Sequence, residues 1–286
     1  MKALRDSRIA VVGLGLMGGS LAGALRGQCR SVVGVARRPE SIEKALERSL
    51  IDRGTRRLPE GVRHADVVVL ATPVRVIIEQ LAAISSLLPE GCLLMDLGST
   101  KTRIVAAMAE LPDHVQPLGG HPMCGKEVSG IEAADPAIYR GATFILTPLP
   151  RTSKKALALG RELAEAAGSQ PLVLSAERQD FLVGTVSHLP YLMACALVAT
   201  ADATTSVDPA AWKIVAGGYR DTTRIAGSDV TMMTDILLTN RDEVLQAVDV
   251  FQGQIRRLAQ LIEDGDEEQL RDALKAIRQE RLRMYP

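Results

Sequence analysis

The sequence predicts an α/β fold in which a doubly wound, mostly parallel sheet is followed by an all-helical C-terminal domain. Three observations predict it. A glycine-rich turn joins an apolar strand to a helix near the N-terminus, continuous apolar strands then alternate with helices, and strand signals stop beyond Ser175. The chain of 286 residues is longer than a typical domain with a single hydrophobic core. We therefore expect two domains, at residues 1–174 and 175–286.

The glycine-rich turn begins the first domain. The apolar run Ile9–Val12 leads into the spacing G-x-G-x-x-G, and a helical pattern begins near Leu16. In such a turn the first glycine allows a sharp bend, the second lets the backbone approach a pyrophosphate, and the third lets the helix pack on the strand. The phosphates lie at the helix N-terminus, where free N–H groups favour negative charge. A turn packed for geometry alone is the alternative. We expect a Rossmann-type dinucleotide-binding domain whose turn contacts the cofactor through Gly13, Gly15, Leu16, Met17 and Gly18.

The second strand, Ser31–Val35, bears on the choice of cofactor. An acidic residue at the end of this strand would bind the ribose 2′-hydroxyl of NAD, but the sequence there is Ala36-Arg37-Arg38. Arginine holds phosphate by forked, charge-assisted hydrogen bonds, so the two arginines favour the 2′-phosphate of NADP over NAD. The alternative is that Arg37 and Arg38 open a solvated loop before Pro39.

Further strands and helices complete the predicted sheet. The expected strands are Asp66–Ala71, Cys92–Leu97, Val115–Leu118, Thr143–Thr147 and Pro171–Leu174, and the expected helices are Val74–Leu88, Thr100–Glu110 and Ser153–Ala167. Ligands of open parallel sheets bind outside the carboxyl ends of the strands. Thr72, which follows the strand Asp66–Ala71, is therefore a further candidate for cofactor binding.

Beyond Ser175 every periodic segment is typical of a helix. The expected helices are Ala176–Ala201, Ala210–Ala216, Asp229–Asn240, Arg241–Glu263 and Glu267–Arg283. Apolar residues in Arg241–Glu263 recur at intervals of three or four residues and form one stripe along the helix. A homodimer built from this half would cover the stripe. Packing within one chain is the alternative.

Composition excludes several classes of partner. Basic and acidic residues balance at 34 each, so no nucleic acid or anionic membrane is expected to bind. The four cysteines are dispersed, which indicates reduced thiols, a cytoplasmic protein and no metal site. Residues 1–7 lack the apolar core of a signal peptide. The low-charge run Phe181–Ala201 approaches the length of a membrane span, but His188 and Pro190 interrupt it and favour a buried helix.

Two segments that follow strands carry candidate catalytic residues. His121 lies between a glycine pair and Pro122, and an imidazole can accept a hydroxyl proton as hydride leaves the same carbon. Its alternative is a single structural hydrogen bond. Ser99 precedes the predicted helix Thr100–Glu110, and the alternative to a catalytic role is helix capping.

Two candidates for substrate binding lie in the helical domain. His188 precedes Pro190, which removes a helical hydrogen bond to Val186 and predicts a kink with room for a ligand; a satisfied core histidine is the alternative. Arg224 ends the segment Gly217–Arg224, which we expect to join two helices, and its guanidinium suits a substrate carboxylate. Arg220, which could instead form a surface ion pair with Asp221, is the alternative.

Five segments together resemble the prephenate/arogenate dehydrogenase (TyrA) family of tyrosine biosynthesis. They are VGLGLMGGSL at Val12–Leu21, DLGSTK at Asp96–Lys101, GGHPM at Gly119–Met123, SHLP at Ser187–Pro190 and YRDTTRIA at Tyr219–Ala226. The resemblance implies oxidative decarboxylation of a cyclohexadienol, prephenate or arogenate, with hydride transfer to NAD or NADP. It also implies helical halves intertwined in a dimer.

The resemblance assigns roles to four of the candidate residues. His121 corresponds to the histidine that accepts the 4-hydroxyl proton, and Ser99 to a serine that hydrogen-bonds near that histidine. His188 corresponds to a histidine of the substrate pocket, and Arg224 to the arginine that binds a substrate carboxylate.

One loop departs from the family pattern. Several relatives carry G-T-E-K-S-G where this chain has Gly125–Gly130, GKEVSG. Glu127 is retained, but the neighbouring replacements put a gating ion pair of this loop in doubt.

Two other functions are alternatives. A β-hydroxyacid dehydrogenase would place a catalytic lysine on the helix entering the second domain, and residues 179–201 contain none. A non-catalytic NADP-binding sensor would have no need for the four candidates together.

Overall fold

The computed structural model describes residues 1–284, in which one eight-stranded sheet has the order β3-β2-β1-β4-β5-β6-β7-β8. Within these residues the pairing of β6 with β7 is antiparallel and all other pairings are parallel. The strands are β1 (Arg8–Val12), β2 (Ser31–Val35), β3 (Arg53–Thr55), β4 (Val67–Leu70), β5 (Leu93–Asp96), β6 (Gln116–Pro122), β7 (Thr143–Pro148) and β8 (Gln170–Val173). The predicted fold class is confirmed.

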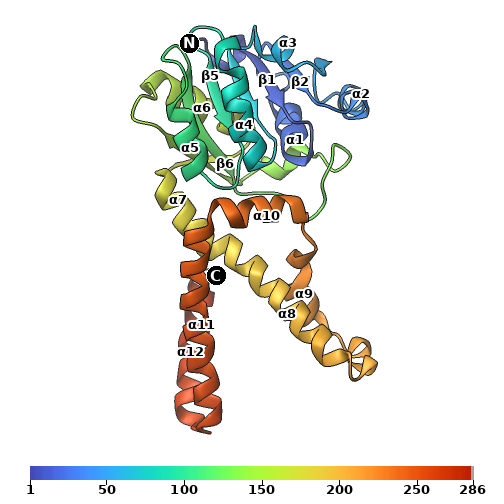
Figure 1. The fold of residues 1–286 in the computed structure, drawn as a ribbon, viewed down its shortest axis with the longest axis vertical. Coiled ribbons are helices and arrows are strands. Elements are labelled where there is room, and N and C mark those ends of the chain that lie inside the picture. The colour runs from blue at the N-terminus through green and yellow to red at the C-terminus, as the bar shows by residue number, and fades with distance from the viewer. Residues whose placement is uncertain (285–286) are drawn as a thin grey trace.

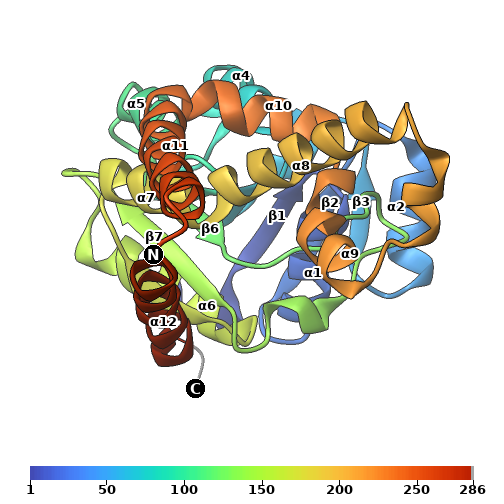
Figure 2. The same ribbon diagram turned by 90° about the horizontal axis from the view of Figure 1, so that it is seen from below.

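Helices cover both faces of this sheet, as the buried, continuously apolar strands require. Leu21 of α1 and Leu163 of α6 pack in the core on one face, and Ile77 of α4 and Ile104 of α5 pack in the core on the other. Figure 2 shows α4 and α5 on one side of the strands and α1 and α6 on the other. The helices are α1 (Leu16–Leu25), α2 (Pro39–Glu47), α3 (Leu58–Val62), α4 (Val74–Ile84), α5 (Thr102–Ala109) and α6 (Lys154–Ala166), with 3-10 turns at Leu4–Asp6, Ser85–Leu87 and Pro136–Tyr139.

Two features of the sheet differ from the sequence prediction. The short strand β3 was not predicted, because the sequence Arg-Gly-Thr has no apolar pattern. Strand β6 continues four residues beyond the predicted end at Leu118, because it pairs with the antiparallel strand β7 as far as Pro122 opposite Phe144. His121 therefore belongs to a strand and lies one residue before its end.

The second part of the chain is helical. It comprises α7 (Ala176–Val183), the π-helical turn η4 (Gly184–His188), α8 (Leu189–Thr205), the 3-10 turn η5 (Pro209–Lys213), α9 (Gly217–Thr223), the 3-10 turn η6 (Arg224–Gly227), α10 (Val230–Thr239), α11 (Arg241–Glu263) and α12 (Glu267–Met284). Figure 1 shows α8 and α11 extending away from the sheet in diverging directions, with α10 lying across its lower edge.

Three predictions for this half need correction. The helix expected over Ala176–Ala201 is interrupted by η4, and the helix expected over Ala210–Ala216 is mostly a 3-10 turn. Gly217–Thr223, expected to be a connection, is a helix.

The segment Ala176–Thr205 is long and apolar enough, by length and composition alone, to cross a membrane. The mean hydropathy of its most apolar window is 1.7, and 22% of that window is buried in the single chain. Its buried positions include Gln179, Asp180 and His188, which face the rest of the molecule. The remaining, largely apolar surface of the segment is exposed.

Candidate active site

The glycine-rich turn at the carboxyl end of β1 has room for a dinucleotide. Gly13 has a φ of +103°, and a Cβ there would lie 2.5 Å from the Ala71 carbonyl oxygen. A Cβ on Gly18 would overlap the Gly13 carbonyl. A Cβ on Gly15, in contrast, would meet no atom within 4 Å, so the backbone is open at the position where a pyrophosphate must approach it. The residues present therefore fit a dinucleotide.

The first residues of α1 present their N–H groups at this open turn. Gly15 is the N-cap of α1, and no side chain caps the helix. Tyr139 fixes the start of the helix by donating from its hydroxyl to the Met17 carbonyl, at 3.1 Å. The predicted contacts Leu16 and Met17 thus lie where helix amides and the helix dipole favour an anion.

Thr72 lies beside the same turn, after β4. Its methyl carbon is 3.0 Å from the position that a Cβ of Gly13 would occupy, and its hydroxyl donates to Gln80 at 2.8 Å. Thr72 therefore packs against the glycine turn at Gly13.

Arginines follow two neighbouring strands at the same edge of the sheet. Arg37 and Arg38 follow β2, and Arg56 follows β3, which pairs with β2 at Val35 opposite Thr55. The Arg56 Nε donates to the Arg37 carbonyl at 3.1 Å. Arg56 was not predicted as a site residue, because the parallel strand that brings it there carries no apolar signal.

His121 is buried at the carboxyl edge of the sheet, with 8% of its surface exposed. Burial, the charge of Lys101 and the neighbouring His188 lower the pKa of His121 well below its ordinary value of 6.5. The ring is therefore neutral at physiological pH. A neutral imidazole can accept a proton, which is what a general base requires.

Gln179 of α7 connects this histidine to the helical half. Its Nε2 lies 3.2 Å from His121 Nδ1 and donates to the Ser99 carbonyl at 3.4 Å. Gln179 is fully buried, and its amide oxygen has no hydrogen-bond partner within the described part of the chain. Gln179 therefore holds the two candidate catalytic residues next to one another.

Ser99 does not cap a helix. Helix α5 begins at Thr102 with Lys101 as its N-cap, two residues later than predicted. The carboxylate of Asp180 satisfies the helix start instead, accepting from the Lys101 N–H at 2.7 Å and from the Thr102 N–H at 2.8 Å. The capping alternative for Ser99 is therefore wrong, and its half-buried side chain is available for other contacts.

A buried ion pair shapes the loops around His121. Asp96 and Lys101 are both fully buried and form an ion pair, and Asp96 also accepts from the Gly98 N–H at 2.7 Å and the Gly120 N–H at 3.1 Å. Such a pair offsets its desolvation only where further hydrogen bonds satisfy it. Asp96 thus ties the loop that carries Ser99 to the strand that carries His121.

His188 is held in the π-helical turn η4. The Leu189 N–H bonds to the Gly184 carbonyl, five residues back, immediately before Pro190. The helix irregularity expected from Pro190 is therefore a π-helical turn, a feature that is frequent at functional sites. Asn240 Nδ2 lies 3.1 Å from His188 Nδ1 and also donates to the Asp180 carbonyl at 2.8 Å. Burial lowers the pKa of His188 to about 4, so this ring is neutral too.

Arg224 lies further out, at the start of η6. Its guanidinium forms an ion pair with Glu127, in the loop that follows β6, and 61% of its side chain is exposed. The retained Glu127 of the loop Gly125–Gly130 therefore forms an ion pair, while a gating role of this loop is not tested by the contact. It joins the sheet domain to the helical domain, but the contacts of Arg224 do not reach His121.

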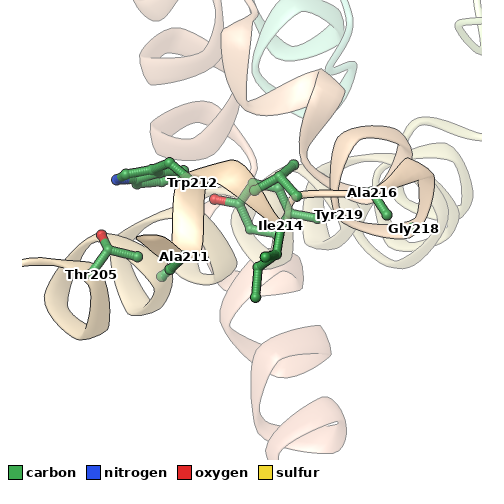
Figure 3. Close-up of a pocket in the computed structure, with 9 residues that line it drawn as sticks. Thr205, Ala211, Trp212, Ile214, Ala216, Gly218 and Tyr219 are labelled. Carbon is green, nitrogen blue, oxygen red and sulfur yellow. The ribbon is translucent and has the colours of Figure 1, made fainter. Parts of the chain in front are cut away.

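The structure thus brings His121, Ser99 and His188 together through three residues that the sequence does not single out, Gln179, Asp180 and Asn240. Their one sequence signal is that they are polar residues at the edges of apolar helices. An apolar hollow of about 380 Å³ lies elsewhere, beyond the end of α8 (Figure 3). None of the candidate site residues lines it.

Two family models match nearly the whole chain. The prephenate dehydrogenase nucleotide-binding domain matches residues 21–172, and the prephenate dehydrogenase dimerization domain matches residues 175–276.

Individual relatives agree with these models. A prephenate dehydrogenase of Bacillus subtilis is 34% identical over 94% of this chain and 74% of its own length. A crystal structure of prephenate dehydrogenase from Aquifex aeolicus, in complex with hydroxyphenyl propionate and NAD+, is 35% identical with a TM-score of 0.91, covering 99% of this chain and 100% of that one. An arogenate dehydrogenase of Synechocystis is 29% identical with a TM-score of 0.84, covering 97% and 99%.

Proposed function

This chain belongs to the prephenate dehydrogenase family, and from that premise we infer how its own residues perform the family's reaction. It is a nicotinamide-dependent dehydrogenase of tyrosine biosynthesis that oxidatively decarboxylates prephenate or arogenate. The β-hydroxyacid dehydrogenase and sensor alternatives are set aside, because the family models match both halves of the chain. A bound nicotinamide supplies the hydride acceptor for the ring carbon that bears the hydroxyl.

The observation that carries the mechanism is the buried, neutral His121 at the carboxyl edge of the sheet that also bears the open glycine turn. As hydride leaves the carbinol carbon, the hydroxyl proton passes to the His121 ring. The electrons of the bond between the ring and its carboxylate then enter the ring, which becomes aromatic and releases carbon dioxide. Because the His121 ring is neutral, a nitrogen lone pair can accept this proton.

Three other residues orient the substrate. Ser99, next to His121, contacts the substrate hydroxyl and the nicotinamide end of the cofactor. His188 contributes a neutral ring to the wall of the substrate pocket. Arg224 binds a substrate carboxylate, exchanging its exposed partner Glu127 for the substrate.

NADP is the preferred cofactor in this proposal. The end of β2 carries no acid to hold a ribose 2′-hydroxyl. Arg37 and Arg38 follow the strand there, and the side chain of Arg56 donates to the Arg37 carbonyl. Arg57 beside them is paired with Glu60 at 3.0 Å, so it contributes less net charge. An extra phosphate would be bound by Arg37, Arg38 and Arg56, which form no ion pair with an acidic residue among residues 1–284. The Aquifex relative was crystallised with NAD+, so the preference is proposed for this chain alone.

Replacing Arg37 by alanine is expected to lower kcat/KM with NADP by about 10- to 100-fold, because a charge-assisted hydrogen bond contributes about 1.5 to 3 kcal/mol. The same variant should change kcat/KM with NAD by less than about threefold. Steady-state rates with each cofactor measure both effects, and Arg57→Ala is the matched control. A clear preference of the parent enzyme for NAD would contradict the proposal.

The domain boundary is placed between residues 174 and 175. The last strand of the sheet ends at Val173, and helices follow from Ala176. The two family models, which end at residue 172 and begin at residue 175, support this division. A cytoplasmic location is a prediction from the sequence.

A homodimer through the helical domain is also proposed, and the exposed apolar surface supports it. Val250, Ile255 and Ile262 of α11 are at least half exposed in the single chain. The hollow beyond α8 adds apolar surface, including Trp212 and the 81% exposed Ile214 (Figure 3). A second copy would cover these surfaces, as the match to a dimerization domain suggests. Light scattering at micromolar concentration should give twice the mass of the chain, and a monomer mass would contradict the dimer.

A further inference from the structure

The amide of Gln179 is in an unusual hydrogen-bonding position. Its nitrogen serves both the Ser99 carbonyl, at 3.4 Å, and His121 Nδ1, at 3.2 Å, while its oxygen is buried with no partner within residues 1–284. A buried carbonyl oxygen without a donor costs about 1 to 3 kcal/mol. The amide oxygen and nitrogen of glutamine have the same shape, so a half-turn of the amide exchanges their positions.

The orientation of this amide determines which nitrogen of His121 carries the proton. If the amide NH2 faces Nδ1, then Nδ1 must accept, and the proton of the neutral ring is on Nε2. In that state Nε2, the nitrogen left to face the substrate, cannot accept a proton. If the amide oxygen faces Nδ1, the ring carries its proton there and Nε2 has a free lone pair. The half-turn gives the amide oxygen a donor in Nδ1–H, breaks the long bond to the Ser99 carbonyl, and leaves the NH2 group in the place that the unpartnered oxygen now occupies.

We propose that Gln179 is a positioning residue that sets the tautomer of His121, its side-chain oxygen accepting from Nδ1–H while Nε2 takes the substrate proton. The proposal rests on the role of His121 as the base. After proton transfer the ring is a cation with both nitrogens protonated, and the same oxygen still accepts from Nδ1–H. Gln179 thereby stabilises the cation without itself exchanging a proton.

The other charged and titratable groups around His121 do not accept a hydrogen bond from its Nδ1 in place of Gln179. Lys101 faces it from the start of α5, but its charge opposes protonation of the ring and is paired with Asp96 of β5. The carboxylate of Asp180 is used by the N–H groups of Lys101 and Thr102. His188 from η4 is neutral and bonded through Nδ1 to Asn240. For the described residues, the hydrogen bond to the His121 ring comes from Gln179.

The test compares Gln179→Leu with Gln179→Glu, with Gln170→Leu on the exposed surface of β8 as a control. Leucine keeps the volume but offers no acceptor, so kcat should fall by about 10- to 100-fold while the KM for the cofactor stays within about twofold. Glutamate restores an acceptor and adds a charge that favours the imidazolium. It should recover most of kcat and move the acid limb of the kcat/KM profile upward by about one pH unit.

The 15N chemical shifts of the His121 ring give a readout that does not depend on activity. With 15N-labelled histidine, and with His121→Asn to assign the signal, the parent should show the proton on Nδ1. The Gln179→Leu variant should show a shift toward the Nε2–H form.

A parent ring protonated on Nε2 and unchanged in Gln179→Leu would overturn the proposal, as would parental kcat and an unchanged pH profile in that variant. A failure of the proposed role of His121 as the base can be distinguished from a failure of the role of Gln179. It would appear as near-parental turnover of His121→Asn, whatever the tautomer.

Discussion

Replacing His121 by asparagine is expected to lower kcat by about two to four orders of magnitude, since this is the contribution of a positioned general base. Asparagine keeps a polar side chain that can bond to Gln179, but it cannot take a proton. Binding depends on the glycine turn and the arginines, so the KM values for substrate and cofactor should change by less than about threefold. Steady-state kinetics with the purified variant measure both effects.

The pH profile of the parent enzyme checks the same assignment. Because burial, Lys101 and His188 lower the pKa of His121, the base is unprotonated at neutral pH and is protonated only well below 6.5. The acid limb of kcat/KM should therefore lie below pH 6.5, with no loss of activity from this group above it. His114, half-buried and bonded to the Leu88 carbonyl at 3.2 Å, offers a control substitution. Near-parental turnover of His121→Asn would mean that the base is another residue.

Replacing Arg224 by alanine should raise the KM for the substrate by about 10- to 100-fold and change kcat much less. A guanidinium that pairs with a carboxylate by charge-assisted hydrogen bonds contributes about 1.5 to 3 kcal/mol of binding free energy. Its present partner Glu127 lies at the surface, where an ion pair contributes little to stability, so the variant should fold normally. Initial rates over a range of substrate concentrations separate the two constants.

Arg220 provides the matched control for this prediction. It is an exposed arginine one helical turn earlier, in α9. Arg220→Ala should leave the substrate KM within about twofold of the parent value. If Arg224→Ala leaves KM unchanged and Arg220→Ala raises it, the carboxylate is bound by Arg220.

Local signals predicted the fold well where short-range interactions determine it. Arg241–Glu263 was predicted with the bounds that α11 has, because its apolar stripe is regular. Ser153 was predicted at the start of a helix, and it is the N-cap of α6, accepting from the Ala156 N–H at 3.2 Å. Longer-range pairing was not predictable in this way. The extension of β6 to Pro122 depends on β7, and β3 forms only because β2 offers it an edge.

The candidate site shows the same division. The glycine turn has a local spacing, and its open backbone at Gly15 agrees with the expectation. His121 and His188 were singled out by their neighbouring prolines and glycines. Gln179 and Asp180, in contrast, act on residues about 60 to 80 positions earlier in the chain, and no local pattern predicts such contacts. Arg56 was missed for the same reason, because its place beside Arg37 depends on an unpredicted strand.

The dehydrogenase activity is tested by measuring the parent enzyme with each of two substrates, prephenate and arogenate, and each of two cofactors, NADP and NAD. Reduced cofactor is followed by absorbance, and released carbon dioxide is measured in the same reactions. We expect turnover of at least one substrate, one carbon dioxide for each cofactor reduced, and a higher kcat/KM with NADP. Absence of turnover in all four combinations, or reduction of the cofactor without carbon dioxide, would contradict this expectation.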